Sequence, residues 1–148
     1  MILKKKMILV AGALVLLALT LPSCRRAPDE AQVREAIAAM VQAAETGSAG
    51  GVGKPLSEDF DGNAGRLDRR GLTGMVRLLA LRGDHVGVTM GPVSIERRGE
   101  RLVATFTATL SSGGKLLPDQ LGVYRVESAW RNEDGDWRCY TATWERVM

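Results

Sequence analysis

Residues 121–146, LGVYRVESAWRNEDGDWRCYTATWER, carry the strongest structural signal in this chain. Two runs rich in aromatic and β-branched residues, 121–131 and 137–146, flank Asp134-Gly135. An Asp-Gly pair between two such runs is typical of a tight β-hairpin turn. We therefore expect the chain to end in two long antiparallel strands.

A symmetric turn at Asp134-Gly135 would also fix which residues of these strands lie opposite each other. The opposed pairs on one face are then Trp130–Cys139, Ser128–Thr141, Val126–Thr143 and Tyr124–Glu145. We expect this face to be the concave one, with Cys139 as a small buried hydrophobe. The candidate pocket residues are Tyr124, Val126, Ser128, Trp130, Thr141, Thr143 and Glu145. A slip of one residue would exchange the two faces.

Further strands precede this hairpin. From His85 onward the apolar residues alternate with a period of two, as in a strand. The alternation changes parity at Gly91-Pro92, where a β-bulge would absorb the shift and bend the strand. It resumes over residues 102–110, so we expect three or four long antiparallel strands in all.

Two amphipathic helices are expected in the first half of the chain. Asp29 offers an N-cap for the first, and Gly47 ends it. The apolar stripe of this helix is Val33, Ile37, Met40, Val41 and Ala44. Asp68 caps the second helix, and Gly83 ends it. Its stripe is Leu72, Met75, Val76 and Leu79. Between the helices we expect a flexible loop over residues 47–53 and a short helical turn over residues 55–60.

This order of elements predicts an α+β domain over residues 29–148, with N-terminal helices packed on a curved antiparallel sheet. The chain resembles the nuclear transport factor 2-like, or ketosteroid-isomerase-like, superfamily. The resemblance rests on Gly91-Pro92, residues 102–110, Gly122-Val123-Tyr124 and Gly135-Asp136-Trp137-Arg138-Cys139. It implies a cone-shaped, cystatin-like fold with a pocket, found in isomerases, dehydratases, transport factors, assembly modules and lipoproteins. The early short hairpin of that family, near residues 58–67, has little visible sequence here.

The first 24 residues have the three parts of an export signal. Lys4-Lys5-Lys6 precede an apolar run over residues 7–19, which is too short to span a bilayer. Leu21-Pro22-Ser23-Cys24 then resembles the bacterial lipobox. That resemblance implies cleavage after residue 23, acylation of Cys24 and a short tether over residues 24–28. By the same resemblance, Arg25 in place of Asp favours sorting to the periplasmic face of the outer membrane in a cell with two membranes. The alternative is an ordinary secretory signal with a coincidental cysteine.

The net positive charge of the chain comes from the lysines of this leader. The chain has 20 Lys+Arg and 17 Asp+Glu, and removal of Lys4, Lys5 and Lys6 leaves 17 (20 − 3) against 17. Nucleic-acid binding depends on a basic surface that displaces counterions. We therefore expect a membrane contact through the lipid anchor and no nucleic-acid partner.

Few residues of the chain are candidates for a catalytic or metal-binding role. Tyr124 and Glu145 could form a base beside a hydrogen-bond donor, as in an isomerase or hydrolase. His85 is the only histidine, so we expect no zinc site. The acidic cluster Glu58, Asp59 and Asp61 lacks the ligand spacing of a calcium loop, and we expect a solvated loop there.

The nucleotide-binding motif is also missing. Gly53-Lys54 is not a phosphate-binding loop, because Ser48 and Pro55 occupy two required positions. We expect no cofactor. The main prediction is a non-enzymatic envelope lipoprotein that binds a small ligand or a protein partner. A further possibility is an accessory subunit that binds its partner through the exposed sheet face, with Tyr140 and Trp144 as anchors. The enzyme using Tyr124 and Glu145 is the alternative, and a homodimer stays open.

Overall fold

The structure is a computed structural model that describes residues 28–112 and 121–148. The predicted leader, the predicted acylation site at Cys24 and the tether residues before Pro28 lie outside the described residues. None of the helices that the structure describes is long and apolar enough to cross a membrane.

Within the described residues, three helices come early in the chain and the longest strands follow them. The helices are α2 (Asp29–Glu45), α3 (Ala49–Gly53) and α4 (Arg69–Leu81). The strands are β1 (Leu56–Gly62), β2 (Leu67–Asp68), β3 (Val86–Met90), β4 (Ser94–Arg98), β5 (Arg101–Ser112), β6 (Gly122–Glu133) and β7 (Asp136–Arg146).

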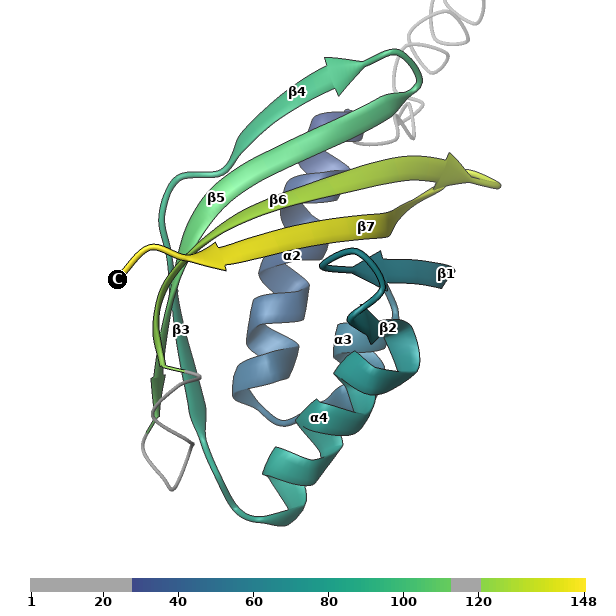
Figure 1. Cartoon of the computed structure of the whole chain (residues 1–148). Coiled ribbons are helices and arrows are strands. Elements are labelled where there is room, and N and C mark those ends of the chain that lie inside the picture. The colour runs from purple at the N-terminus through teal and green to yellow at the C-terminus, as the bar shows by residue number, and fades with distance from the viewer. Residues whose placement is uncertain (1–27, 113–120) are drawn as a thin grey trace, which may run out of the picture.

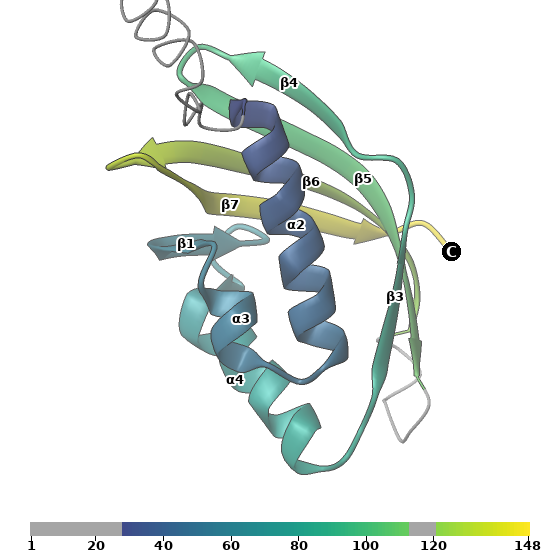
Figure 2. The same ribbon diagram turned by 180° about the vertical axis from the view of Figure 1, so that it is seen from behind.

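All seven strands form one curved sheet. Its order is β2-β1-β7-β6-β5-β3, and β4 also pairs with β5. The pairing of β1 with β7 is parallel, whereas the other pairs are antiparallel. Figures 1 and 2 show α2 packed along the concave side of the sheet, with α3 and α4 closing the end near β1. The predicted α+β architecture is confirmed.

Helix α2 buries the first two residues of the predicted stripe, whereas Met40, Val41 and Ala44 are half-buried. Val33 and Ile37 are 0% and 5% exposed and belong to the main core. The predicted N-cap is wrong, because Pro28 occupies that position and Asp29 is the first helical residue. The Asp29 carboxylate is used in tertiary contacts instead, accepting hydrogen bonds from Trp137 Nε1 at 3.0 Å and from Arg97 Nη2 at 2.8 Å.

The predicted cap of α4 is confirmed. Asp68 Oδ1 accepts a hydrogen bond from the backbone N–H of Gly71 at 2.7 Å. Gly47 and Gly83 follow α2 and α4, and both have φ of +72°. Glycine adopts this left-handed conformation without steric cost, which explains why the helices end there.

The segment between α2 and α4 differs from the prediction. Residues 49–53 form the short helix α3, which Ser48 caps, instead of a loop. Residues 55–60 contribute to β1 instead of a helical turn, and β1 forms an antiparallel hairpin with β2. The early hairpin is therefore present. Local sequence did not reveal it because β1 is held by a parallel pairing with β7, far along the chain.

The bend at Gly91-Pro92 separates β3 from β4, which both pair with β5. Met90 lies opposite Ala108, and Ser94 lies opposite Thr105. Ser94 is four residues after Met90, but Thr105 is only three residues before Ala108, so the segment between β3 and β4 contains one extra residue. This extra residue is the predicted bulge. A Cβ at Gly91 would lie 2.5 Å from Thr107 Oγ1, so any larger residue here would have to displace the Thr107 side chain.

Candidate functional site

A second bulge sets the side chains of the concave face. Trp130 pairs with Cys139, as predicted, but the next pair towards the C-terminus is Ala129 with Thr141. Tyr140 is therefore an extra residue of β7. Beyond it, the register differs by one from the prediction, and the pairs are Ser128–Ala142, Val126–Trp144 and Tyr124–Arg146.

This shift separates the two residues predicted to carry chemistry. Tyr124 stays on the concave face, but Glu145 moves to the outer face, opposite Arg125. Glu145 is 67% exposed and accepts a hydrogen bond from Arg125 Nη1 at 3.0 Å. The predicted pairing of Tyr124 with Glu145 is wrong.

The other pocket candidates divide in the same way. Val126, Ser128 and Trp130 lie on the concave face, whereas the register places Thr141 and Thr143 on the outer face. Their predicted places are taken by two residues of the face that was expected to be solvated, because Ala142 is 9% exposed and Trp144 packs against the core. The concave face is consequently more apolar than predicted.

Trp130 fills the inner end of this face. It is 1% exposed, and its Nε1 donates a hydrogen bond to Ser128 Oγ at 2.9 Å. Further along the sheet the concave side chains of Phe106, Val126 and Trp144 are only half-buried. This end of the concave face offers apolar contact surface.

Cys139 is not a reactive thiol. It is free and 3% exposed, so the predicted burial opposite Trp130 is confirmed. Burial raises the pKa of the Cys139 thiol to about 12. At neutral pH the residue is therefore a protonated, small apolar group.

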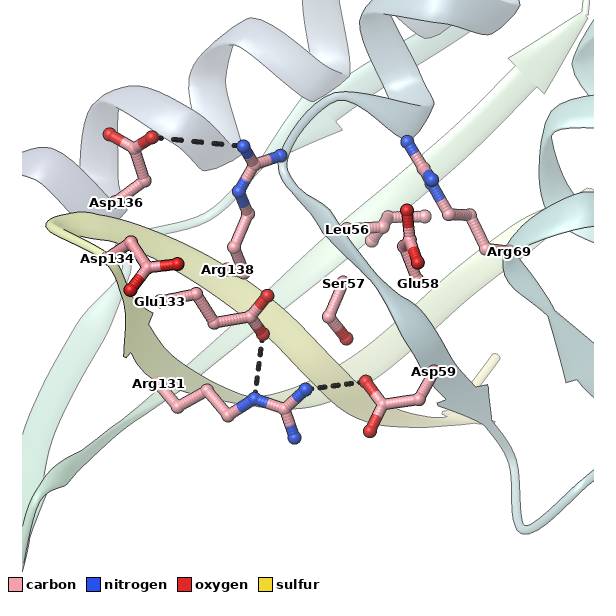
Figure 3. A pocket seen from close by; sticks show the side chains of 10 residues that line it. All are labelled: Leu56, Ser57, Glu58, Asp59, Arg69, Arg131, Glu133, Asp134, Asp136 and Arg138. Carbon is pink, nitrogen blue, oxygen red and sulfur yellow. Dashed lines mark hydrogen bonds and ion pairs between the residues drawn. The ribbon is translucent and has the colours of Figure 1, made fainter.

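A polar cleft lies beside β1 on the outer side of the hairpin (Figure 3). Its volume is about 740 Å³. The lining residues are Leu56, Ser57, Glu58, Asp59, Arg69, Arg131, Glu133, Asp134, Asp136 and Arg138. The acidic cluster Glu58, Asp59 and Asp61 was predicted to lie in a solvated loop. This prediction is wrong, because all three residues belong to β1.

Arg131 organises this cleft. Its Nη2 donates to Asp59 Oδ1 at 2.6 Å, and its Nε donates to Glu133 Oε2 at 2.7 Å (Figure 3). The hydrogen bond from Arg131 lowers the pKa of Asp59. Both carboxylates therefore neutralise the guanidinium of Arg131, whereas the buried Ser57 Oγ in the wall of the cleft has no hydrogen-bond partner among the described residues.

No metal site accompanies these features. Within residues 28–112 and 121–148, no three His, Cys, Asp or Glu side chains converge on a common point. His85 is exposed and directly precedes β3. His85 therefore lies in the loop between α4 and β3.

Helix α4 carries the second apolar surface of the domain. None of its residues is fully buried, although the sequence predicts an inward stripe. Leu72 packs partly against the core, whereas Met75, Leu78 and Leu81 are 41%, 48% and 79% exposed. The predicted inward position of Met75 is wrong, and Leu78 and Leu81 lie outside the predicted stripe.

Comparisons with solved structures define the fold. An NTF2-like protein from Cytophaga hutchinsonii superposes with a TM-score of 0.65 at 11% identity, over 81% of this chain and 99% of that one. An NTF2-like protein with a cystatin-like fold from Novosphingobium aromaticivorans gives 0.62 at 18% identity, over 93% and 88%. An NTF2-like protein of unknown function from Pseudomonas putida gives 0.63 at 16% identity, over 78% and 84%.

The chain therefore has the NTF2-like, cystatin-like fold. At these identities the likeness extends to the fold alone. No protein-family model matches the sequence, and no curated protein matches it either.

Proposed function

We propose that this chain is an envelope lipoprotein, anchored through Cys24, whose NTF2-like domain binds a protein partner and catalyses no reaction. The observation that carries the proposal is the composition of the two accessible surfaces. The half-buried part of the concave face is apolar, and α4 exposes Met75, Leu78 and Leu81. Exposed apolar side chains that cluster on one element are typical of interaction surfaces.

The arrangement of ionisable groups supports binding over catalysis. General acid–base catalysis needs an ionisable side chain within hydrogen-bond reach of the proton that it transfers. Tyr124 and Glu145 lie on opposite faces of the sheet, and the thiol of Cys139 is held protonated. Fold alone does not imply an activity.

The anchor rests on the leader sequence and on the lipobox-like Leu21-Pro22-Ser23-Cys24. Several acyl chains on one cysteine give firm attachment, because each buried methylene contributes about 0.8 kcal/mol. Residues 24–28 would hold the start of α2 close to the bilayer.

Mass spectrometry of the detergent-extracted, full-length gene product tests the anchor. We expect a chain that begins at Cys24 and carries diacylglycerol, and we expect Cys24→Ser to leave the leader attached. A product released from cells without fatty chains would contradict the anchor. Turnover of a substrate that Tyr124→Phe abolishes, with the fold intact, would contradict the non-enzymatic role.

A further inference from the structure

We propose that the outward face of α4 is a docking site for an acidic, amphipathic segment of a partner protein. This inference rests on the proposed binding function and names the surface and the charge of the partner. It begins with the composition of the helix. From Arg69 to Arg82 the sequence reads RRGLTGMVRLLALR, with four arginines and no acidic residue.

The spacing of these residues places charge and apolar surface together. Arg70 and Arg77 are seven positions apart and lie on the same side of the helix. Leu78 and Leu81 adjoin them, and all four side chains are exposed. Leu72, Val76 and Leu79, which are half-buried, occupy the inward side. The exposed face, defined by Arg70, Arg77, Leu78 and Leu81, is called the α4 face below.

The arginines of the α4 face are not used by the fold. Most ion pairs in the described part of the chain join arginines of the sheet to carboxylates, as Arg97, Arg125 and Arg131 do. No ion pair within the described residues includes Arg70 or Arg77. By contrast, Arg69 turns inward, and its Nε donates to the carbonyl of Gly53 at 3.1 Å. The α4 face therefore presents free guanidinium groups beside leucines.

The position of α4 favours a protein over a bilayer as the occupant. A basic amphipathic helix suits either an anionic membrane or an acidic protein segment. Figures 1 and 2 show that α2 begins at one end of the domain and that α4 lies at the other. A lipid on Cys24, tethered through the few residues before α2, would thus leave the α4 face turned away from its own membrane.

The chemistry of the α4 face defines the partner. Guanidinium groups form paired hydrogen bonds with carboxylates, so Arg70 and Arg77 would select Asp or Glu side chains. Leu78 and Leu81 would contact apolar residues one helical turn apart on the same segment. A single helix face is small, so the contact would be of the transient class.

Crosslinking in intact cells tests the proposal. A photo-crosslinking amino acid replaces Leu78 in the full-length protein, and Thr143 on the outer sheet face serves as the control position. We expect crosslinks from position 78 to one protein segment, mapped by mass spectrometry, that carries a net negative charge. Crosslinks to lipid or to a neutral or basic segment, or no crosslinks at position 78, would overturn the proposal. Crosslinks from position 143 alone would overturn the α4 assignment and leave the binding function standing.

A binding assay tests the charge requirement directly. The probes are two synthetic helical peptides with the same leucine stripe, one flanked by Glu and one by Lys, measured against the mature chain with Cys24→Ser. We expect the Glu peptide to bind at least about tenfold more tightly, a difference that corresponds to about 1.4 kcal/mol. Arg70→Gln with Arg77→Gln should remove this preference. The control variant, Arg98→Gln with Arg125→Gln, removes two exposed arginines of the sheet and should retain the preference for the Glu peptide.

Binding to anionic vesicles tests the alternative that the α4 face contacts a membrane. The same variants are sedimented with vesicles of phosphatidylglycerol and phosphatidylcholine. Vesicle binding that depends on Arg70 and Arg77, together with equal binding of the Glu and Lys peptides, would overturn the proposal in favour of a bilayer contact. Equal peptide binding without vesicle binding would overturn it as well.

Discussion

The guanidinium carbon of Arg131 lies 5.1 Å from the centre of the Tyr140 ring. Tyr140 is the extra residue of β7, and its hydroxyl accepts a hydrogen bond from Arg101 Nη1 at 3.2 Å. The pairing of β1 with β7 is irregular at the same place, between Leu56 and Asp61. Because Arg131 also binds Asp59 of β1, one side chain connects three strands where the sheet departs from regular geometry.

Removal of the Tyr140 ring should therefore destabilise the domain. We expect Tyr140→Ala to lower the free energy of unfolding by about 1–2 kcal/mol, because it loses the cation–π contact and the packing over the bulge. Tyr140→Phe keeps the ring and should lose less than about half of this. Urea unfolding followed by tryptophan fluorescence measures both. Equal losses in the two variants would show that the ring contact contributes nothing.

Ser128 should matter through Trp130. Ser128→Ala leaves the indole N–H of Trp130 without its acceptor inside the core, where an unsatisfied donor costs about 1–3 kcal/mol. Ser111→Ala, at an exposed position of β5, should change stability by less than about 0.5 kcal/mol. Urea unfolding of the two variants provides the comparison. A Ser128→Ala protein as stable as the parent would mean that the indole finds another acceptor.

Cys139 should be inert in the folded protein. With its thiol pKa raised to about 12 by burial, Cys139 carries almost no thiolate at about pH 8 and is shielded from reagents. In the mature chain with Cys24→Ser, we expect a disulfide reagent to label it only as fast as the domain opens. The same chain in concentrated urea should react at once. Rapid labelling without denaturant would contradict the buried position of the thiol.

Asp59 should make stability depend on pH in a defined direction. Because Arg131 lowers the pKa of Asp59 in the folded state, the ionised carboxylate stabilises the fold above its unfolded pKa, which for Asp is about 3.9. This contribution is lost as the pH falls through the lower, folded pKa. We expect Asp59→Asn to be less stable than the parent at about pH 7 and equal to it at about pH 2.

The neighbouring Glu58 provides the control for this titration. Glu58 has no ion pair within the described residues, so Glu58→Gln should have little effect at either pH. Urea midpoints at the two pH values measure the difference. A deficit of Asp59→Asn that persists in acid would show that its cause is not the charge of the carboxylate.

Local patterns predicted the elements whose causes are local. The Val33–Ile37 stripe predicted α2, Asp68 predicted the start of α4, and Asp134-Gly135 predicted the hairpin. Asp134 and Gly135 have φ of +53° and +95°, the conformation that this turn requires. Near the turn, the pairing of Trp130 with Cys139 follows directly from these two residues.

The errors arose where distant contacts decide the structure. Nothing in Cys139-Tyr140-Thr141 marks a bulge, because no glycine or proline is present and the bulge is held by Arg131 and Arg101 from other strands. Because of this one extra residue, Tyr140, Glu145 lies on the outer face instead of the predicted concave face. Strand β1 was missed for a similar reason, since its partner β7 is far away in the sequence. The candidate site depended on both features, so it was predicted less well than the fold.

The place of β7 in the sheet has a consequence for how the molecule is made. The last strand of the chain lies between β1 and β6, so it joins the early hairpin to the rest of the sheet. A chain that emerges with its N-terminus first, from a ribosome or a secretion pore, can bring these halves together only after Asp136–Arg146 has emerged. Until then β1 lacks its partner, and loss of the final strand would leave two separate fragments of sheet.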